Sequence, residues 1–186
     1  MEREKPSHKP RLRFDQTYPG HEEYLLHLYN VFKNLVGTPP KIHTRKPDKR
    51  TNKIYQTIAL KTLRYPYLNY YYDLFYKYND SNKRYKVIPN NIKELLNGRA
   101  LVYLIMDDGN IDSYKATHLN THKFSFNCIN LLRDALKDKF YLKTRIIKKQ
   151  NDQITKVIPI KEKYSLASIV GPYMYPTMTY KVKGLN

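Results

Sequence analysis

The segment LVYLIMDDG, residues 101 to 109, constrains the fold more than any other feature of the chain. Its apolar run predicts a buried helix that ends in Asp107, Asp108 and Gly109. Because the helix dipole disfavours carboxylates at a C-terminus, we expect a compensating positive charge there, and a divalent cation is the obvious candidate. The alternative is an ordinary helix that stops at a DDG turn, since Asp and Gly are common turn residues.

The balance of charge indicates the class of partner. Lys and Arg total 34 against 16 Asp and Glu, which leaves a formal net charge of +18. Such an excess is typical of nucleic-acid-binding proteins. No segment approaches the roughly 18 apolar residues of a spanning helix, so we expect no membrane partner. The single cysteine, Cys128, excludes a disulfide framework and is interpreted as a buried core residue.

Apolar periodicity divides the chain into two related halves. The first half is expected to contain a strand at 11–16 with Arg11 and Arg13 on its wet face, a helix at 21–36, a basic hairpin at 41–62 and a helix at about 66–78. The second is expected to contain helices at 91–96, 99–109, about 125–139 and 165–170, a strand near 116–121 and a basic hairpin at 141–160. Each half closes on the tripeptide Tyr-Lys-Val, at 85–87 and 180–182.

Together these segments resemble the LAGLIDADG homing endonuclease family, in particular its single-chain, two-motif, intron-encoded members. The resemblance covers residues 11 to about 183 and rests on LVYLIMDDG, VIPNNIKELLNGRAL, TPPKIHTRKPDKRTNKIY, LNYYYDLFY and GPYMYPTMTYK. It implies an α+β fold of two pseudo-symmetric αββαββα units with an antiparallel saddle sheet that binds DNA. The implied organisation is an N-terminal tail (1–10), an incomplete first half (11–90) and a second half (91–186) with the motif helix at 99–109.

The resemblance also implies a catalytic centre. Asp108 corresponds to the metal-binding acid and Asp107 is its neighbour, while Lys86 and Lys181 match the basic residues that close each family half. The expected cofactor is Mg²⁺ or another divalent cation, because carboxylate-bound Mg²⁺ can activate water and neutralise a phosphate. Lysines add positive charge at the same phosphates.

Contacts with DNA are expected from basic and amide side chains of the strands and hairpins, because Arg pairs with guanine and Gln with adenine in the major groove. The candidates are Arg11, Arg13, Arg45, Lys46, Lys49, Arg50, Lys53, Gln56, Arg145, Lys148, Lys149, Gln150, Gln153 and Lys156. Each of these side chains has the alternative of being an ordinary solvated surface residue.

The chain departs from the family pattern in two respects. No first motif helix precedes residue 11, and Glu2 and Glu4, near the place of a matching acid, are interpreted as exposed tail residues. Val102 stands where the family usually has a small residue that lets two helices approach closely. The chain is thus interpreted as a truncated product, as a binder that has lost cleavage, or as a homodimer; a monomer with an internal pseudo-dimer is favoured over the homodimer.

Three functions remain open from the sequence. The first is a site-specific, Mg²⁺-dependent endonuclease acting on double-stranded DNA. The others are a maturase that binds intron RNA and an inactive nucleic-acid-binding remnant. The resemblance implies a mitochondrial protein rather than a chloroplast one, because members of this group are typical of mitochondria. The N-terminal residues mix both charges and include prolines, unlike a targeting peptide, so we expect the protein to be encoded in the organelle.

Overall fold

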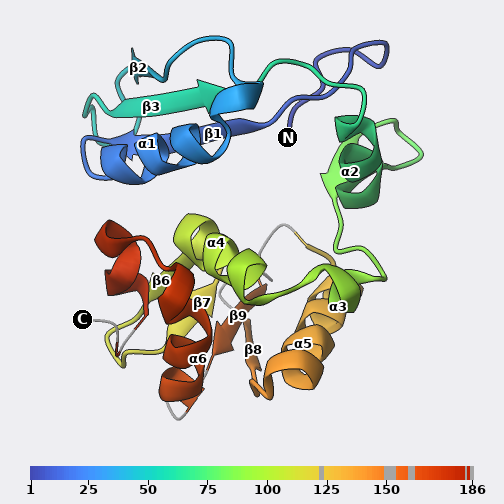
Figure 1. Cartoon of the computed structure of the whole chain (residues 1–186), viewed down its shortest axis with the longest axis vertical. Helices are drawn as coiled ribbons and strands as arrows, with labels where there is room; N and C mark the ends of the chain where they lie inside the picture. The colour runs from blue at the N-terminus through green and yellow to red at the C-terminus, as the bar shows by residue number, and fades with distance from the viewer. Residues whose placement is uncertain (122–123, 149–153, 159–161, 183, 185–186) are drawn as a thin grey trace. The chain divides into compact units, whose positions relative to one another are not determined.

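A computed structural model describes residues 1–121, 124–148, 154–158, 162–182 and 184 (Figure 1). The chain divides into two compact units, Met1–Asp73 and Leu74–Asn186. Both contain helices and antiparallel strands, so the fold is α+β as predicted. The units divide upstream of residue 90, where the sequence was divided into halves. The boundary between two compact units need not coincide with the boundary between two sequence repeats. The division into halves at residue 90 therefore stays a prediction.

Unit 1 is built on a three-stranded antiparallel sheet in the order β1-β3-β2, with α1 lying along β1 and β3 (Figure 1). Its elements are β1 (Arg13–Tyr18), α1 (Glu22–Val31), η1 (Lys33–Leu35), β2 (Lys41–Thr44), β3 (Gln56–Lys61) and α2 (Leu68–Phe75), whose last turn crosses into unit 2. The predicted hairpin and first helix are confirmed, and the first strand begins at Arg13 rather than Arg11.

The two faces of this sheet differ in polarity, because side chains alternate along each strand and directly paired residues share a face. Phe14 pairs with Leu60 on one face, where Phe14 also stacks on Phe32, just beyond α1, with ring centroids 5.2 Å apart. The opposite face is called the polar face, and its exposed side chains are Arg13, Asp15, Thr17, Lys41, His43 and Lys61. The sheet therefore buries its apolar side under α1 and leaves its polar side to solvent.

Unit 2 contains a two-stranded ribbon, β4-β5, and a four-stranded antiparallel sheet in the order β6-β7-β9-β8. Its elements are β4 (Tyr76–Tyr78), β5 (Arg84–Lys86), α3 (Ile92–Leu95), α4 (Gly98–Asp108), β6 (Gly109–Ile111), β7 (Thr117–Leu119), α5 (Phe126–Phe140), β8 (Arg145–Lys148), β9 (Ile154–Ile158), α6 (Lys163–Val170), η3 (Gly171–Tyr173) and η4 (Pro176–Lys181). The predicted helix at 66–78 is wrong in its last turn, because residues 76–78 pair with β5.

The order of elements from α4 to α6 is αββαββα, as the resemblance implies. Unit 1 has the order βαββα. Within residues 1–73, all of which the structure describes, both the motif helix and the strand that would follow it are absent. Cys128 is buried in α5, in agreement with its interpretation as a core residue.

The N-terminal residues pack within unit 1. Glu2 and Arg11 form an antiparallel bridge with backbone N–O distances of 3.0 and 3.1 Å. The Glu2 carboxylate lies 2.6 Å from the Arg11 guanidinium, and 20% of the Glu2 side chain is exposed. The interpretation of Glu2 as an exposed tail residue is therefore wrong, because the arginines beside β1 hold its carboxylate. Glu4 remains half exposed but also pairs with Arg11.

We predict that Glu2→Gln removes a pH-dependent part of the stability. Burial, the largest influence, raises the pKa of Glu2, but Arg11, Lys61 and Arg13 together outweigh it and lower the pKa below 4.5. Such a carboxyl stabilises the fold above its unfolded pKa and loses this contribution as the pH falls through its folded pKa. In urea denaturation, wild type should be more stable than the variant at about pH 7, and the two should converge near pH 3. A difference that is the same at both pH values would contradict this prediction.

Candidate functional site

Helix α4 carries two acidic side chains to its C-terminal tip. The helix starts where the Asn97 side chain accepts a hydrogen bond from the Ala100 backbone N–H at 2.8 Å, an N-cap that satisfies one otherwise unpaired donor. Four apolar side chains on one face are buried: Leu101, Val102, Ile105 and Met106. Asp107 and Asp108 follow at exposed positions. The burial of one side of the helix therefore fixes where the two carboxylates emerge.

Gly109 allows the chain to turn directly from α4 into β6. Its φ of −87° suits any residue, but a Cβ at this position would lie 2.5 Å from the Ile105 carbonyl oxygen. Pairing with β7 begins at Gly109 itself, opposite Leu119. The Asn120 backbone N–H also donates to the Asp108 carbonyl at 3.0 Å. Close packing, rather than backbone conformation, therefore requires glycine after the two acids.

Lys181 lies beside the same helix end. Its side chain is buried, and its ammonium donates a hydrogen bond to the Met106 carbonyl oxygen. The Thr117 hydroxyl donates to the Lys181 carbonyl at 3.3 Å and ties η4 to β7. Burial lowers the pKa of Lys181, while the negative charges of Asp107 and Asp108 oppose that shift. The structure thus brings Lys181 together with Asp107 and Asp108, three of the four residues predicted for the catalytic centre.

This arrangement changes one expectation from the sequence. From the sequence, a divalent cation was the obvious candidate for the positive charge expected at the acidic helix tip. The Lys181 ammonium supplies part of that charge, because it contacts a carbonyl of the last turn and interacts with both aspartates. The acidic tip by itself is therefore weaker support for a metal than the sequence argument assumed.

Lys86 has different surroundings from Lys181, although both belong to Tyr-Lys-Val tripeptides. Lys86 is exposed in β5, where it pairs with Tyr76 of β4. Lys181 is buried at the end of a 3₁₀ helix. The repeated tripeptide therefore does not have a repeated local structure, and a shared catalytic role for Lys86 stays a prediction.

The predicted DNA-binding residues of unit 1 group around the polar face and its hairpin. Arg13 lies on the polar face and Arg45, which follows β2, pairs with Asp15 of this face at 3.3 Å. Lys46, Lys49, Arg50 and Lys53 are exposed in the β2–β3 turn, which Asp48 organises by accepting two backbone N–H bonds at 2.9 Å. Gln56 pairs with Tyr18, so it shares the strand face of Ile58 and Leu60 and not the polar face.

In unit 2 the structure describes only some of the predicted DNA-binding residues. Arg145 is exposed in β8, while Lys148 and Lys156 lie in paired strands, opposite Ile154 and Leu119 respectively. Lys149, Gln150 and Gln153 fall outside the described residues.

Sequence reasoning missed some polar residues. Lys41 and Lys61 share the polar face with Arg13, and the alternation of the strands was a signal that could have found them. In unit 2, His118 of β7 lies 2.7 Å from Asp112, and this hydrogen bond lowers the pKa of Asp112. Their six-residue separation spans a turn and has no sequence signature.

The donor atoms at the α4 tip suit a hard divalent cation. Carboxylate and carbonyl oxygens are the ligands that Mg²⁺ prefers. Among the described residues, however, no group of three or more His, Cys, Asp or Glu side chains is arranged to hold a metal. Asp107 and Asp108 would therefore form part of a coordination sphere that also requires water or nucleic-acid oxygens, which is usual for Mg²⁺.

The family model for LAGLIDADG DNA endonucleases matches residues 1–166. The chain belongs to this family. DNA endonuclease I-ChuI of Chlamydomonas applanata is 31% identical over 176 residues, which cover 89% of this chain and 80% of that protein. Cytochrome b mRNA maturase bI2 of Saccharomyces cerevisiae is 33% identical over 187 residues, which cover 97% of this chain and 43% of the maturase.

A solved structure shares the fold. The homing endonuclease I-WcaI bound to its DNA recognition sequence superposes with a TM-score of 0.84 at 24% identity, covering 97% of this chain and 78% of the other. The LAGLIDADG fold implied by the sequence is thereby confirmed. Across the described residues, helices are too short or too polar to cross a bilayer.

We predict that Gly109→Ala destabilises the protein by about 1–3 kcal/mol, because the added methyl group meets backbone atoms of Ile105 that cannot rotate away. Gly20→Ala is the matched control, since a Cβ there meets nothing within 4 Å. Urea denaturation of both variants measures the difference. Equal stability of the two variants would show that the turn after α4 relaxes without cost.

Proposed function

We propose that this chain is a site-specific endonuclease of the intron-homing type, which hydrolyses phosphodiesters of double-stranded DNA with Mg²⁺ or another divalent cation. The observation that carries the proposal is the exposed pair of carboxylates at the tip of α4, with the Lys181 ammonium beside them. Family membership and the likeness to a protein named a DNA endonuclease support it.

Asp108, with Asp107 as its neighbour, is the residue proposed to hold the cation. A bound divalent cation activates water and neutralises charge on the phosphate. The chain's own contribution is to fix the carboxylates, through the buried face of α4 and the close turn at Gly109. Lys181 anchors the helix end through the Met106 carbonyl and offsets the negative charge of the two acids. Direct action of Lys181 or Lys86 on a phosphate remains part of the proposal.

DNA would contact the polar face and hairpin of unit 1 and the sheet of unit 2. The exposed cations there offer charge for phosphates and donors for guanine edges. We favour a monomer in which 11–90 and 91–186 represent the two family halves. We also propose a mitochondrial origin, because two relatives are named cytochrome b mRNA maturases.

We predict that Asp108→Asn lowers DNA cleavage by roughly a hundredfold or more while duplex binding is retained, because the change removes a charged ligand but no basic contact. The assay is cleavage of a randomised duplex library in Mg²⁺, with EDTA as the metal-free reference. Asp134→Asn, an exposed change on α5, makes the same alteration of charge away from the tip and should leave cleavage intact.

The products of the same assay also distinguish how complete the site is. Duplexes cut in both strands indicate that two acids act, and duplexes cut in one strand only indicate a single acid. Cleavage by Asp108→Asn at the wild-type rate would contradict the assignment of this acid. No cleavage by wild type, together with retained binding, would contradict the endonuclease proposal for this chain.

An RNA-binding maturase is the second candidate, favoured by the 33% identity to maturase bI2 across 97% of this chain. A maturase uses the basic surface but needs no metal at the α4 tip. We therefore predict that Asp108→Asn leaves splicing of the host intron unchanged if this function holds. A variant that binds RNA normally but no longer supports splicing would count against the maturase.

A further inference from the structure

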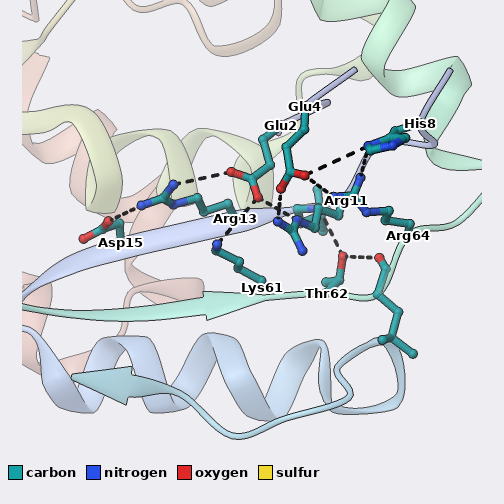
Figure 2. Close-up of polar contacts among 11 residues, drawn as sticks. Glu2, Glu4, His8, Arg11, Arg13, Asp15, Lys61, Thr62 and Arg64 are labelled. Carbon is teal, nitrogen blue, oxygen red and sulfur yellow. Dashed lines mark hydrogen bonds and ion pairs between the residues drawn. The ribbon is translucent and has the colours of Figure 1, made fainter. Parts of the chain in front are cut away.

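The N-terminal segment brings two carboxylates onto the cations beside β1 (Figure 2). The residues of this N-terminal ion-pair cluster are Glu2, Glu4, Arg11, Arg13, Lys61 and Arg64. Arg11 and Arg13 are candidates for DNA contact, and Lys61 lies opposite Arg13 on the polar face. In this cluster the protein's own carboxylates therefore pair with cationic side chains that are expected to contact DNA phosphates.

Glu2 contacts three of these cations. One of its carboxylate oxygens lies 2.6 Å from Arg11 Nε and 3.9 Å from Lys61 Nζ, and the other lies 3.4 Å from Arg13 Nη1. The remaining terminal nitrogen of Arg13 pairs with Asp15 at 3.0 Å. Both terminal nitrogens of Arg13 are thus occupied by carboxylates, so binding to a phosphate or a guanine requires an exchange of partners.

Glu4 completes the cluster on its other side. Its two carboxylate oxygens lie 2.5 Å from Arg11 Nη2 and 2.8 Å from Arg64 Nη2. Arg11 is therefore held by Glu2 through Nε and by Glu4 through Nη2.

The segment is held in place by more than its charges. The backbone bridge between Glu2 and Arg11 extends the edge of β1. The Arg3 guanidinium donates to Asn69 at 2.7 Å and lies 4.0 Å from the centroid of the Tyr72 ring. The carboxylates are thus fixed beside the cations, which lowers the conformational-entropy cost of forming the ion pairs.

We propose that Glu2 and Glu4 compete with DNA for the cations beside β1 and thereby weaken the binding of the chain to DNA of random sequence. This inference rests on the proposed DNA-binding function. Phosphates on any duplex compete with the internal carboxylates for the same cations, and both anions repel each other when close. Binding without base contacts depends almost wholly on phosphates, so competition for these cations weakens it directly.

The test measures the affinity of the full chain for a random-sequence duplex by fluorescence anisotropy over a range of salt concentrations. The test variant is Glu2→Gln with Glu4→Gln. Its matched control is Glu94→Gln with Asp134→Asn, exposed changes on α3 and α5 that raise the net charge equally. We expect the test variant to bind about three- to tenfold more tightly than the control at low salt. Its salt dependence should steepen by about 0.9 in log–log slope per freed cation.

A second variant guards against loss of folding. Glu4 is half exposed, so Glu4→Gln alone should fold like wild type and give a smaller gain in affinity. Adding Arg11→Gln and Arg13→Gln to the test variant should abolish the gain, because these arginines are its source.

Two results would overturn the inference. A test variant that binds no more tightly than the control would show that the carboxylates do not compete, and weaker binding would show that they instead hold the arginines in a binding pose. Wild type that fails to bind duplex DNA at low salt would contradict the proposed function itself, whatever the variants do.

Discussion

The contact between Lys181 and the C-terminal turn of α4 is the interaction on which the site depends. A helix that ends in two carboxylates is destabilised by its own dipole, and a buried ammonium on the Met106 carbonyl offsets that effect. A second hydrogen bond, from the Thr117 hydroxyl of β7 to the Lys181 carbonyl, ties η4 to the sheet of unit 2. The acidic tip is thus a product of the whole unit and not of the helix alone.

Helix α4 and the second half could be predicted because their signals are local. A long apolar stripe, the Asn97 cap and the DDG turn lie within one stretch of sequence, and Ser125 marks the start of α5 in the same way. The family resemblance then supplied the αββαββα order that the structure confirms. The residues at the tip could likewise be located from the sequence, because Asp107, Asp108 and Gly109 directly follow the apolar run of the predicted helix.

What could not be predicted depends on pairing between distant residues. Strands β4, β5 and β6 have three residues each, and their pairing partners rather than a local pattern make them strands. The different settings of Lys86 and Lys181 follow from packing that identical tripeptides do not reveal. Glu2 was misread for the same reason: its partner cations lie on strand residues that only the fold brings to it.

The central claim is that the α4 tip binds a divalent cation, and Mn²⁺ titration observed by NMR tests it most directly. Paramagnetic Mn²⁺ broadens signals near its binding site. The account predicts that substoichiometric Mn²⁺ selectively broadens the amide signals of Asp108, Gly109 and Asn110, and that Asp108→Asn removes this effect. Broadening confined to other residues, or equal broadening in the variant, would contradict the claim.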